Sequence, residues 1–263
     1  MMQNQSIIAN FMAALEEREF QVYYQPKVNI KDKTLCGAEA LVRWQRDGKL
    51  ISPMQFIPQL EREGSIIKLD YYMLEEVCHF LRKWMDEGHA PICISVNFSR
   101  KHLDEDDMVE HIVSILDEHG IAHQYIEIEL TESEDFQNYE IMTNIVNELS
   151  EAGIGTSMDD FGTGFSSLNM IKKLDLKVIK IDRSFIPLET DYSGKDKDMI
   201  MFCNIVTLLR ELGKKTIAEG VETQQQLRYL ENVGCDIVQG YVFDKPLCEA
   251  DFRKRLENGY GSC

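Results

Sequence analysis

The sequence predicts an α/β protein with a TIM-like (β/α)8 barrel. Strand-like and helix-like segments alternate along the chain, which favours a parallel sheet with crossover helices. The length of 263 residues suits one barrel of this kind, which typically needs roughly 250 residues. Seven apolar runs also stop on polar side chains, and these stops are Glu39, Asn97, Glu129, Asp159 with Asp160, Lys180, Glu219 and Gln239. We expect one domain over residues 1–263, with a leading helix at about 6–18 and the barrel at about 20–258.

Each expected element follows from a local pattern. Apolar residues between 7 and 15 recur at helical spacing, which predicts the leading helix. Pro53 suits the first turn of a helix. The elements expected in the first third are a strand at 20–28, a strand at 36–44, a helix at 53–63 and a helix at about 66–86.

The middle of the chain continues the alternation. After a strand at 92–98, a helix is expected at 103–120, because its acidic first turn suits the helix dipole and Gly120 suits its C-cap. In the strand at 125–130, Glu127 and Glu129 fall on one face. The remaining elements are strands at 154–160, 177–182, 215–220 and 236–241 and helices at 165–174, 199–212, 225–234 and 249–259. A polar insertion at 189–198 is a candidate mobile loop.

Composition narrows the class of protein. A hydrophobic content of 44% with 28% charged residues is typical of a globular protein with a sizeable core. The formal net charge of −17 disfavours duplex nucleic acid and anionic membranes as partners. No signal-peptide pattern and no run of eighteen apolar residues is found. Seven cysteines without a CxxC pair are interpreted as reduced core residues of a cytoplasmic protein.

The polar strand ends predict a metal site. Because the carboxyl ends of barrel strands converge on one rim, residues far apart in sequence meet there. Asp159 and Asp160 precede a glycine-rich turn, and Glu39, Asn97 and Glu129 supply further oxygen ligands of the type that Mg²⁺ prefers. A zinc site is not expected, since the histidines His119 and His123, four residues apart, are separated by Gly120. The alternative for Asp159 and Asp160 is a turn capped by aspartate.

Lys180 and Glu219 are the candidate catalytic residues. Lys180 could hold a water or a phosphate oxygen, or it could neutralise a buried carboxylate such as Glu127. Glu219 could accept a proton from an attacking water. Its alternative, an acid at a helix N-terminus, fits Glu222 better.

Three further side chains are candidates for binding the substrate. Arg43 could form a fork to phosphate, or it could lay its aliphatic stem on Trp44 at the surface. Gln25 and Gln239 could read a base edge or satisfy backbone groups.

Seven motifs occur in one order across nearly the whole chain: GAEALVRW, SVNFS, IELTES, DDFGTGFSSL, KIDRSF, AEGVET and QGYVFDKPL. Together they resemble the EAL-domain family of bacterial cyclic di-GMP phosphodiesterases. The resemblance implies a single phosphodiesterase domain in which the first barrel strand runs antiparallel to the others. It also implies hydrolysis of one phosphodiester bond of cyclic di-GMP to linear 5′-pGpG at a two-metal site.

The resemblance assigns roles motif by motif. It implies that Glu39, Asn97, Glu129 and Asp159 hold one divalent cation and that Asp159 and Asp160 hold the second. Lys180 matches the residue that orients the water, and Glu219 matches the general base. Substrate-contacting positions are matched by Gln25, Leu41, Arg43, Asp182, Gln239 and Pro246. Positions that support the metal ligands from behind are matched by Glu132, Glu222 and Thr163.

The same resemblance implies Mg²⁺ or Mn²⁺ as cofactor, inhibition by Ca²⁺, a cytoplasmic bacterial location and a homodimer. Two other functions stay open at this point. One is a catalytically silent receptor for cyclic di-GMP, although none of the acids is lost here. The other is a Schiff-base aldolase with Lys180 as its nucleophile.

Overall fold

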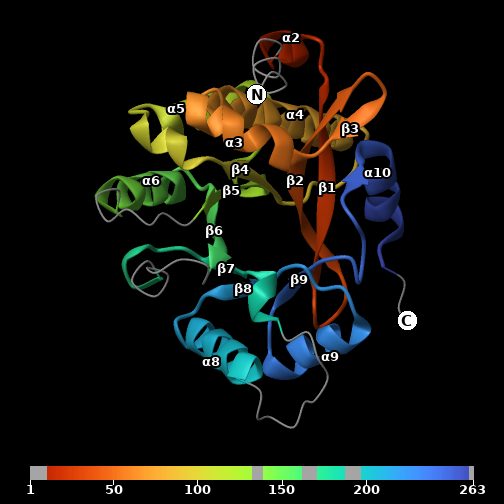
Figure 1. Cartoon of the computed structure of the whole chain (residues 1–263), viewed down its shortest axis with the longest axis vertical. Coiled ribbons are helices and arrows are strands. Elements are labelled where there is room, and N and C mark those ends of the chain that lie inside the picture. Colours follow the sequence, from red (N-terminus) through yellow and green to blue (C-terminus); the bar gives the residue numbers. More distant parts are fainter. Residues whose placement is uncertain (1–10, 132–138, 162–170, 187–196, 261–263) are drawn as a thin grey trace.

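Eight strands close into a barrel that is surrounded by helices (Figure 1). The computed structural model describes residues 11–131, 139–161, 171–186 and 197–260. Around the barrel the strand order is β1-β9-β8-β7-β6-β5-β4-β2, and the pairing of β1 with β2 closes it. The strands β3 and β10 extend the sheet at β2 and β1. The predicted TIM-like barrel is therefore confirmed.

The direction of β1 is the exception within the barrel. It pairs antiparallel with both of its barrel neighbours, β2 and β9, whereas the other barrel pairs are parallel. This confirms the expectation of an antiparallel first strand. The strands are β1 (Phe20–Asn29), β2 (Leu35–Arg46), β3 (Lys49–Ile51), β4 (Ile94–Phe98), β5 (Ile126–Thr131), β6 (Gly155–Phe161), β7 (Val178–Ile181), β8 (Lys215–Ala218), β9 (Ile237–Gln239) and β10 (Leu247–Cys248).

Helices form the outer layer of the molecule (Figure 1). The α-helices are α2 (Phe11–Glu16), α3 (Pro53–Glu63), α4 (Ile66–Asp86), α5 (Met108–Glu118), α6 (Tyr139–Glu151), α8 (Lys197–Glu211), α9 (Gln224–Val233) and α10 (Glu249–Asn258). Short 3-10 turns occur at η1 (Arg100–Asp104), η2 (His123–Tyr125) and η4 (Arg183–Phe185).

The helices predicted at 53–63 and 66–86 have those bounds in the structure. Pro53 occupies the first turn of α3, where its missing N–H has no helical partner to lose. The helix ends at Gly64, which has a φ of 74° that favours glycine. The predicted and observed bounds of α3 agree because a proline marks its first turn and a glycine marks its end.

The prediction of one helix over 103–120 is wrong. The structure has η1 first, and α5 begins only at Met108 after Asp107, so the acid run precedes the helix instead of forming its first turn. His102 within η1 is 1% exposed and lies 3.1 Å from Asp70 and 2.6 Å from Glu105. These contacts of a buried imidazole override the local helical pattern.

The leading helix, expected at about 6–18, is described only from Phe11, and α2 ends at Glu16. Its end agrees with the left-handed backbone of Arg18, whose φ is 54°. The helix packs its buried Phe11 against Phe20 of the first strand, with ring centroids 5.7 Å apart. Residues 1–10 lie outside the described part of the chain, as does most of the insertion at 189–198.

The interpretation of the cysteines as core residues is only partly right. Cys78 and Cys235 are buried, but Cys36 and Cys203 are exposed, and Cys93 and Cys248 are intermediate. All six are free thiols. Cys263 lies outside the described residues.

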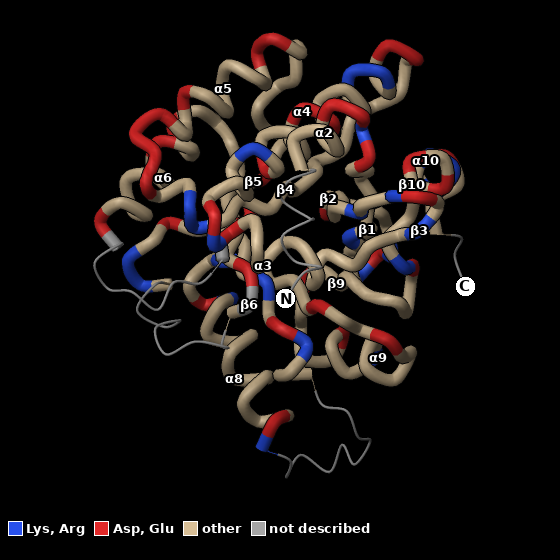
Figure 2. The backbone as a smooth tube through the Cα atoms, turned by 45° about the horizontal axis from the view of Figure 1, so that its top comes forward, with Lys and Arg blue, Asp and Glu red and all other residues tan. Residues whose placement is uncertain are grey.

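The surface charge is spread over the outer helices. Figure 2 shows acidic residues on α5, α6, α9 and α10 without one dominant acidic face. None of the described helices combines the length and the apolar character that a membrane span requires.

Candidate active site

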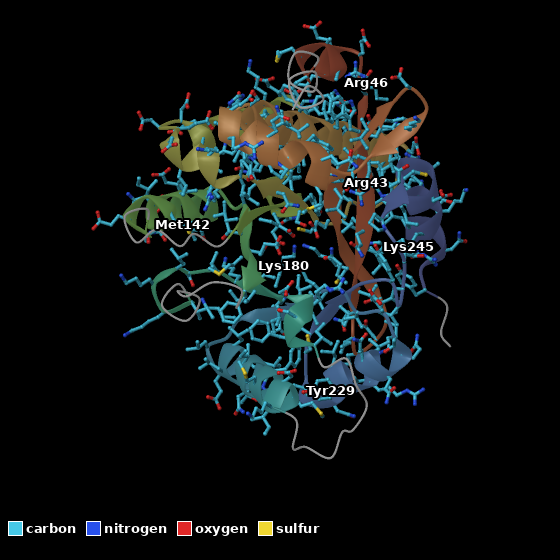
Figure 3. The ribbon with its side chains drawn as sticks, in the orientation of Figure 1. Arg43, Arg46, Met142, Lys180, Tyr229 and Lys245 are labelled. Carbon is cyan, nitrogen blue, oxygen red and sulfur yellow. The ribbon has the colours of Figure 1, made fainter. Side chains whose placement is uncertain are left out.

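The carboxyl ends of the strands bring the predicted polar residues together. Asn97 on β4 pairs in register with Glu129 on β5, and Gln25 on β1 pairs with Glu39 on β2. Lys180 on β7 rises into the middle of the barrel (Figure 3). Residues that are up to 214 positions apart, such as Gln25 and Gln239, therefore share one site.

Lys180 is the centre of this site and is fully buried. Its ammonium nitrogen lies 3.3 Å from Glu39 Oε2, 3.1 Å from Asp159 Oδ1 and 2.7 Å from Glu219 Oε1. It also donates a short hydrogen bond to Glu129. Four carboxylates, three on the strands β2, β5 and β6 and one directly after β8, thus surround one ammonium group. Lys180 therefore neutralises buried carboxylates, as its alternative role expected, but these are Glu39 and Glu129, whereas Glu127 pairs with another lysine.

The carboxylates in this cluster differ in proton affinity. Burial raises the pKa of Glu219 to about 8; Asp159, Glu39 and Glu129 add to the rise and Lys180 opposes it. Burial also raises the pKa of Glu39, with the charge of Glu129 as the next cause. Burial acts on Glu129 in the same direction, but the ammonium groups of Lys180 and Lys27 outweigh it and lower its pKa to about 2. The pKa of Glu129 is therefore lowered and that of Glu219 raised within the same cluster.

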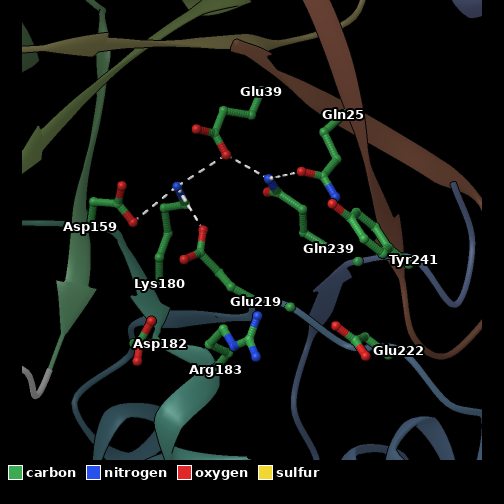
Figure 4. A pocket seen from close by; sticks show the side chains of 12 residues that line it. Gln25, Glu39, Asp159, Lys180, Asp182, Arg183, Glu219, Glu222, Gln239 and Tyr241 are labelled. Atoms are coloured by element: carbon green, nitrogen blue, oxygen red, sulfur yellow. Dashed lines mark hydrogen bonds and ion pairs between the residues drawn. The ribbon is translucent and has the colours of Figure 1, made fainter. Parts of the chain in front are cut away.

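A cavity of about 260 Å³ opens above this cluster (Figure 4). Glu39, Asp159, Lys180, Glu219 and Gln239 form its polar floor. Gln239 is 4% exposed and donates hydrogen bonds to Glu39 and, at 3.4 Å, to Gln25. The other lining residues are Gln25, Asp182, Arg183, Gly220, Glu222, Gly240 and Tyr241.

The floor of the cavity fits a divalent cation. Oxygens of Glu39, Glu129 and Asp159 lie within 4.8 Å of one another, and Asn97 donates to Glu39 at 2.8 Å from the same rim. Gln239 Oε1 is buried and has no hydrogen-bond partner among the described residues. Carboxylate and amide oxygens are the ligands that hard cations prefer. The ammonium of Lys180 shows that a positive charge is already favoured at this point.

The aspartates at 159 and 160 lie on an irregular part of β6. Neighbouring residues of a regular strand point to opposite faces. Here the pairing of β6 with β7 shifts register between Met158 and Phe161, so the strand is bulged where it carries both aspartates. Bulges of this kind redirect side chains beside active sites. The side chain of Asp160 lies outside the described part, and so do Glu132 and Thr163.

A second cavity, of about 200 Å³, is lined by residues 40–43 of β2 and 96–99 at the end of β4. Leu41, Arg43 and Asn97 line it together with apolar residues of α3 and α4. Arg43 donates to the carbonyl of Val42 and its guanidinium lies 5.6 Å from the ring centroid of Tyr23. The arginine whose guanidinium lies over the Trp44 ring is Arg46.

Of three further predicted residues, Asp182 and Glu222 line the first cavity and Pro246 does not. Asp182 lines the first cavity and accepts a hydrogen bond from the backbone of Ser184, which caps η4. Glu222 lines the same cavity just before α9. Pro246 precedes β10 and lines neither of these two cavities.

Sequence reasoning missed Lys27, a second buried lysine one layer below Lys180. Its ammonium lies 2.7 Å from Ser95 Oγ, 3.0 Å from Glu127 Oε1 and 2.9 Å from Glu129 Oε1. Glu127 also accepts a hydrogen bond from Ser157 at 3.0 Å. The signal available in the sequence was spacing: on a strand, Lys27 falls on the same face as Gln25. Glu129 therefore lies between two lysines.

Tyr241 was also missed, although it follows Gln239 by two residues. Its side chain is 54% exposed at the mouth of the first cavity. An exposed aromatic ring beside a polar cavity can stack on a nucleobase.

Gly240 allows two rim segments to cross in close contact. A Cβ atom at this position would lie 2.2 Å from the carbonyl oxygen of Val221. The two segments are joined by backbone hydrogen bonds from Val221 to Gln239 and from Val242 to Val221. This crossing holds the segment after Glu219 against the strand end that carries Gln239.

Comparison with known proteins identifies the family. A family model described as the EAL domain matches residues 8–246. The chain belongs to the EAL domain family. It is 36% identical over 242 residues to MucR of Pseudomonas aeruginosa, a bifunctional diguanylate cyclase/cyclic di-GMP phosphodiesterase, covering 92% of the chain and 35% of the relative.

Another relative is PdeR of Escherichia coli, a cyclic di-GMP phosphodiesterase that is 31% identical over 246 residues. That match covers 93% of the chain and 36% of PdeR, so the chain spans about a third of the length of these relatives. A solved structure of the PaMucR phosphodiesterase in complex with c-di-GMP aligns with a TM-score of 0.84 and 35% identity. The alignment covers 94% of this EAL domain chain and 99% of the solved chain.

Proposed function

We propose that this chain hydrolyses one phosphodiester bond of cyclic di-GMP to linear 5′-pGpG with the help of divalent cations, Mg²⁺ or Mn²⁺. The observation that carries the proposal is the group of Glu39, Glu129 and Asp159, whose oxygens lie within 4.8 Å of one another, with Glu39 and Asp159 on the floor of an open cavity and Glu129 buried behind them. Membership of the EAL domain family and relatives named as cyclic di-GMP phosphodiesterases support the substrate.

The residues proposed to hold the cations are Glu39, Asn97, Glu129, Asp159 and Asp160. Bound cations would supply Lewis acidity and bring the pKa of water close to neutral. The anionic substrate can bind only if the negative charge of the site's carboxylates is neutralised. Two lysines do not neutralise its carboxylates, so a phosphodiester would be repelled from the site without further positive charge.

Glu219 is the proposed general base. Its Oε1 lies 2.7 Å from the ammonium nitrogen of Lys180, on the floor of the cavity, where a water held by that lysine would be within reach of the carboxylate. In the proposed step Glu219 takes a proton from water as the water oxygen bonds to phosphorus. The bond from phosphorus to the 3′ oxygen breaks, and this oxygen takes a proton from solvent, which leaves a 5′-phosphate and a 3′-hydroxyl.

Lys180 is proposed to orient the attacking water through its N–H groups. Its carboxylate partners raise its pKa well above the usual range, although burial acts in the opposite direction. A lysine that is held as an ammonium cannot act as a Schiff-base nucleophile, which requires a neutral amine. This argument disfavours the aldolase alternative.

The substrate-contacting roles are proposals of the same kind. Gln25, Gln239 and Asp182 line the cavity above the cation site, while Leu41 and Arg43 line the neighbouring one. We assign Tyr241 a stacking role toward a guanine base, because it is the exposed aromatic ring in the lining of the first cavity. Pro246, Glu132, Glu222 and Thr163 keep their proposed supporting roles.

The deciding experiment measures pGpG formation from cyclic di-GMP with Mg²⁺ and with Mn²⁺. Wild type is compared with Glu39→Gln, Glu219→Gln and the exposed control Glu211→Gln on α8. Both site variants should lose activity by about 100-fold or more, but only Glu39→Gln should also weaken cation binding. The control should match wild type. Chelation should abolish turnover, and Ca²⁺ should occupy the site without supporting it.

A different outcome favours the receptor function. If wild type binds cyclic di-GMP tightly but forms no pGpG with either cation, the chain is a silent receptor and the enzymatic proposal fails. Substantial substrate affinity in chelated protein would contradict the electrostatic part of the argument.

We also propose a homodimer in the cytoplasm of a bacterium. Support for a dimer comes from α8, which exposes the apolar side chains of Ile200, Met201 and Leu208. Exposed apolar side chains gathered on one helix are typical of protein interfaces. Sedimentation of wild type and Leu208→Glu tests it, since the charged variant should shift toward monomer.

A further inference from the structure

Two histidines from different helices face each other on the outside of the barrel, away from the cavity. His79 lies on α4, and His119 follows the last residue of α5. Their Nε2 atoms are 3.4 Å apart, with the rings perpendicular and their centroids separated by 4.6 Å. The two helices pack side by side in the outer layer (Figure 1). The pair considered in the sequence, His119 with His123, does not form.

His123 is unavailable because both of its ring nitrogens have partners. Nδ1 lies 2.6 Å from the carbonyl of Ala152, and Nε2 lies 3.1 Å from Asp117 Oδ1. His119 and His79 differ from it, since each directs Nε2 toward the other ring.

The hydrogen bonds of His119 fix its tautomer. Its Nδ1 lies 2.9 Å from the carbonyl oxygen of Ile115 in the last turn of α5. A carbonyl can only accept, so Nδ1 carries the hydrogen and Nε2 of the neutral ring presents a lone pair. A histidine that binds a metal typically donates its other N–H in this way.

His79 has an acidic neighbour on the corresponding side. Glu76 Oε1 lies 3.9 Å from Nδ1 of His79, which favours the tautomer with hydrogen on Nδ1. In that state the Nε2 atoms of both rings present lone pairs to each other at 3.4 Å, which is repulsive without a cation between them. The alternative is a weak hydrogen bond between the rings, which would turn the bare Nδ1 of His79 toward the carboxylate.

The separation of the two nitrogens matches one coordination geometry. Zinc binds histidine nitrogen at about 2.0–2.1 Å with tetrahedral angles, which places two ligand nitrogens about 3.3–3.4 Å apart. Ligands at 90°, as in square-planar or octahedral sites, would be about 2.9–3.0 Å apart. The observed distance agrees with the tetrahedral value.

The surroundings tolerate a cation at this place. Arg82, three residues after His79 on α4, is paired with Asp86 at 2.6 Å, and its Nη1 lies beside Gly120. His79 is 54% exposed, so water can supply the remaining ligands. The negative net charge of the chain also attracts cations to its surface.

We propose that His79 and His119 form a zinc site that links α4 to the end of α5. The ion is held by the two Nε2 atoms and completed by water. This site is distinct from the oxygen-rich cluster in the barrel, because Mg²⁺ does not favour imidazole ligands. The zinc site takes no part in the proposed hydrolysis, and its existence does not depend on that proposal.

The test uses the whole chain in saturating Mg²⁺, which occupies the barrel site, and adds ZnCl₂. Bound zinc is counted for wild type, His79→Gln, His119→Gln and the control His111→Gln, an exposed histidine of α5. Wild type and the control should bind one zinc ion per chain more than either site variant. Zinc should also raise the unfolding temperature of wild type and of the control, but not of the site variants.

Co²⁺ serves as a spectroscopic probe, since tetrahedral Co²⁺ absorbs visible light far more strongly than octahedral Co²⁺. The tetrahedral band should appear with wild type and be lost in both site variants. Equal zinc counts in all four proteins would overturn the proposal and leave the hydrogen-bonded pair of rings. Phosphodiesterase activity with Mg²⁺ should be the same in all four, so a failure here is separable from a failure of the proposed function.

Discussion

Lys27 and Lys180 occupy similar positions inside the barrel but have different surroundings. Lys27 lies in the lower layer and binds one hydroxyl and two carboxylates, those of Ser95, Glu127 and Glu129. Lys180 lies in the upper layer, beneath the open cavity, and has four carboxylate partners. In the lower layer the ammonium of Lys27 is fully hydrogen-bonded and shut off from the cavity. In the upper layer the four carboxylates around Lys180 carry more negative charge than its single ammonium can neutralise.

The two layers differ in the balance of charge between their lysines and carboxylates. The five carboxylates that these lysines contact are Glu39, Glu127, Glu129, Asp159 and Glu219. Two ammonium groups against five carboxylates leave a formal charge of −3 when all are ionised, because 2 − 5 = −3. The excess is concentrated around Lys180, where cations can enter. We infer that the lower layer stabilises the fold and that the upper layer is built to bind positive charge.

The largest expected effect is that of Lys27→Met. The variant leaves Glu127 and Glu129 buried without their common cation, and breaking a buried ion pair typically costs about 3–5 kcal/mol. Urea unfolding in saturating Mg²⁺ should show this loss in the free energy of unfolding. The exposed control Lys31→Met should stay close to wild type. A loss below about 1 kcal/mol would show that the lower layer is not a structural ion pair.

Lys180→Met should be less destabilising, because divalent cations can replace the missing charge. In chelated protein the variant should lose stability, and Mg²⁺ should restore most of it by binding among the same carboxylates. The same titration should not rescue Lys27→Met, since that layer is closed. Equal rescue of both variants would remove the distinction between the layers.

The pH dependence of the chelated protein tests the upper layer alone. With a folded pKa of about 8 and an unfolded pKa near 4.5, Glu219 keeps a proton in the native state that the unfolded chain has released. The free energy of unfolding should therefore fall as pH rises from about 5 to about 8, by at most about 1.4 kcal/mol per pH unit. Glu219→Gln should flatten this slope in urea unfolding. An unchanged slope would show that Glu219 is not held protonated.

Ser157→Ala gives the smallest expected effect. It removes the hydrogen bond at 3.0 Å from Ser157 Oγ to Glu127, while Lys27 still neutralises that carboxylate. A loss of about 1–2 kcal/mol in unfolding free energy is expected, with phosphodiesterase activity unchanged. A large loss of activity would mean that the lower layer takes part in the chemistry.

The barrel and most of its rim could be predicted because the signals are local. Apolar runs that end on Glu39, Asn97, Glu129 and Lys180 are visible in the sequence, and parallel strands bring such ends together. The catalytic roles of these residues remain proposals, while their contacts with one another are a feature of the structure, since Asn97 donates to Glu39 and Lys180 binds both Glu39 and Glu129.

The lower layer could not be predicted, because it depends on how the barrel closes. Lys27 meets partners that are 68, 100 and 102 positions away, and their depth depends on the stagger of strands on opposite walls. The zinc-site histidines pose the same problem, since His79 and His119 are 40 positions apart on separate helices. Helix patterns predict which face is apolar but do not predict which exposed side chains of neighbouring helices face each other.

The crossing at Gly240 has a consequence for how relatives of this chain are sorted into active and silent ones. Any larger residue at that position would force apart the segments on which Glu219 and Gln239 depend, although every acid and amide would still be spelled out in the sequence. A relative could thus keep all the catalytic side chains and still be inactive, because a larger residue has replaced this one glycine. A sequence survey that checks only the catalytic residues would classify such a protein as active.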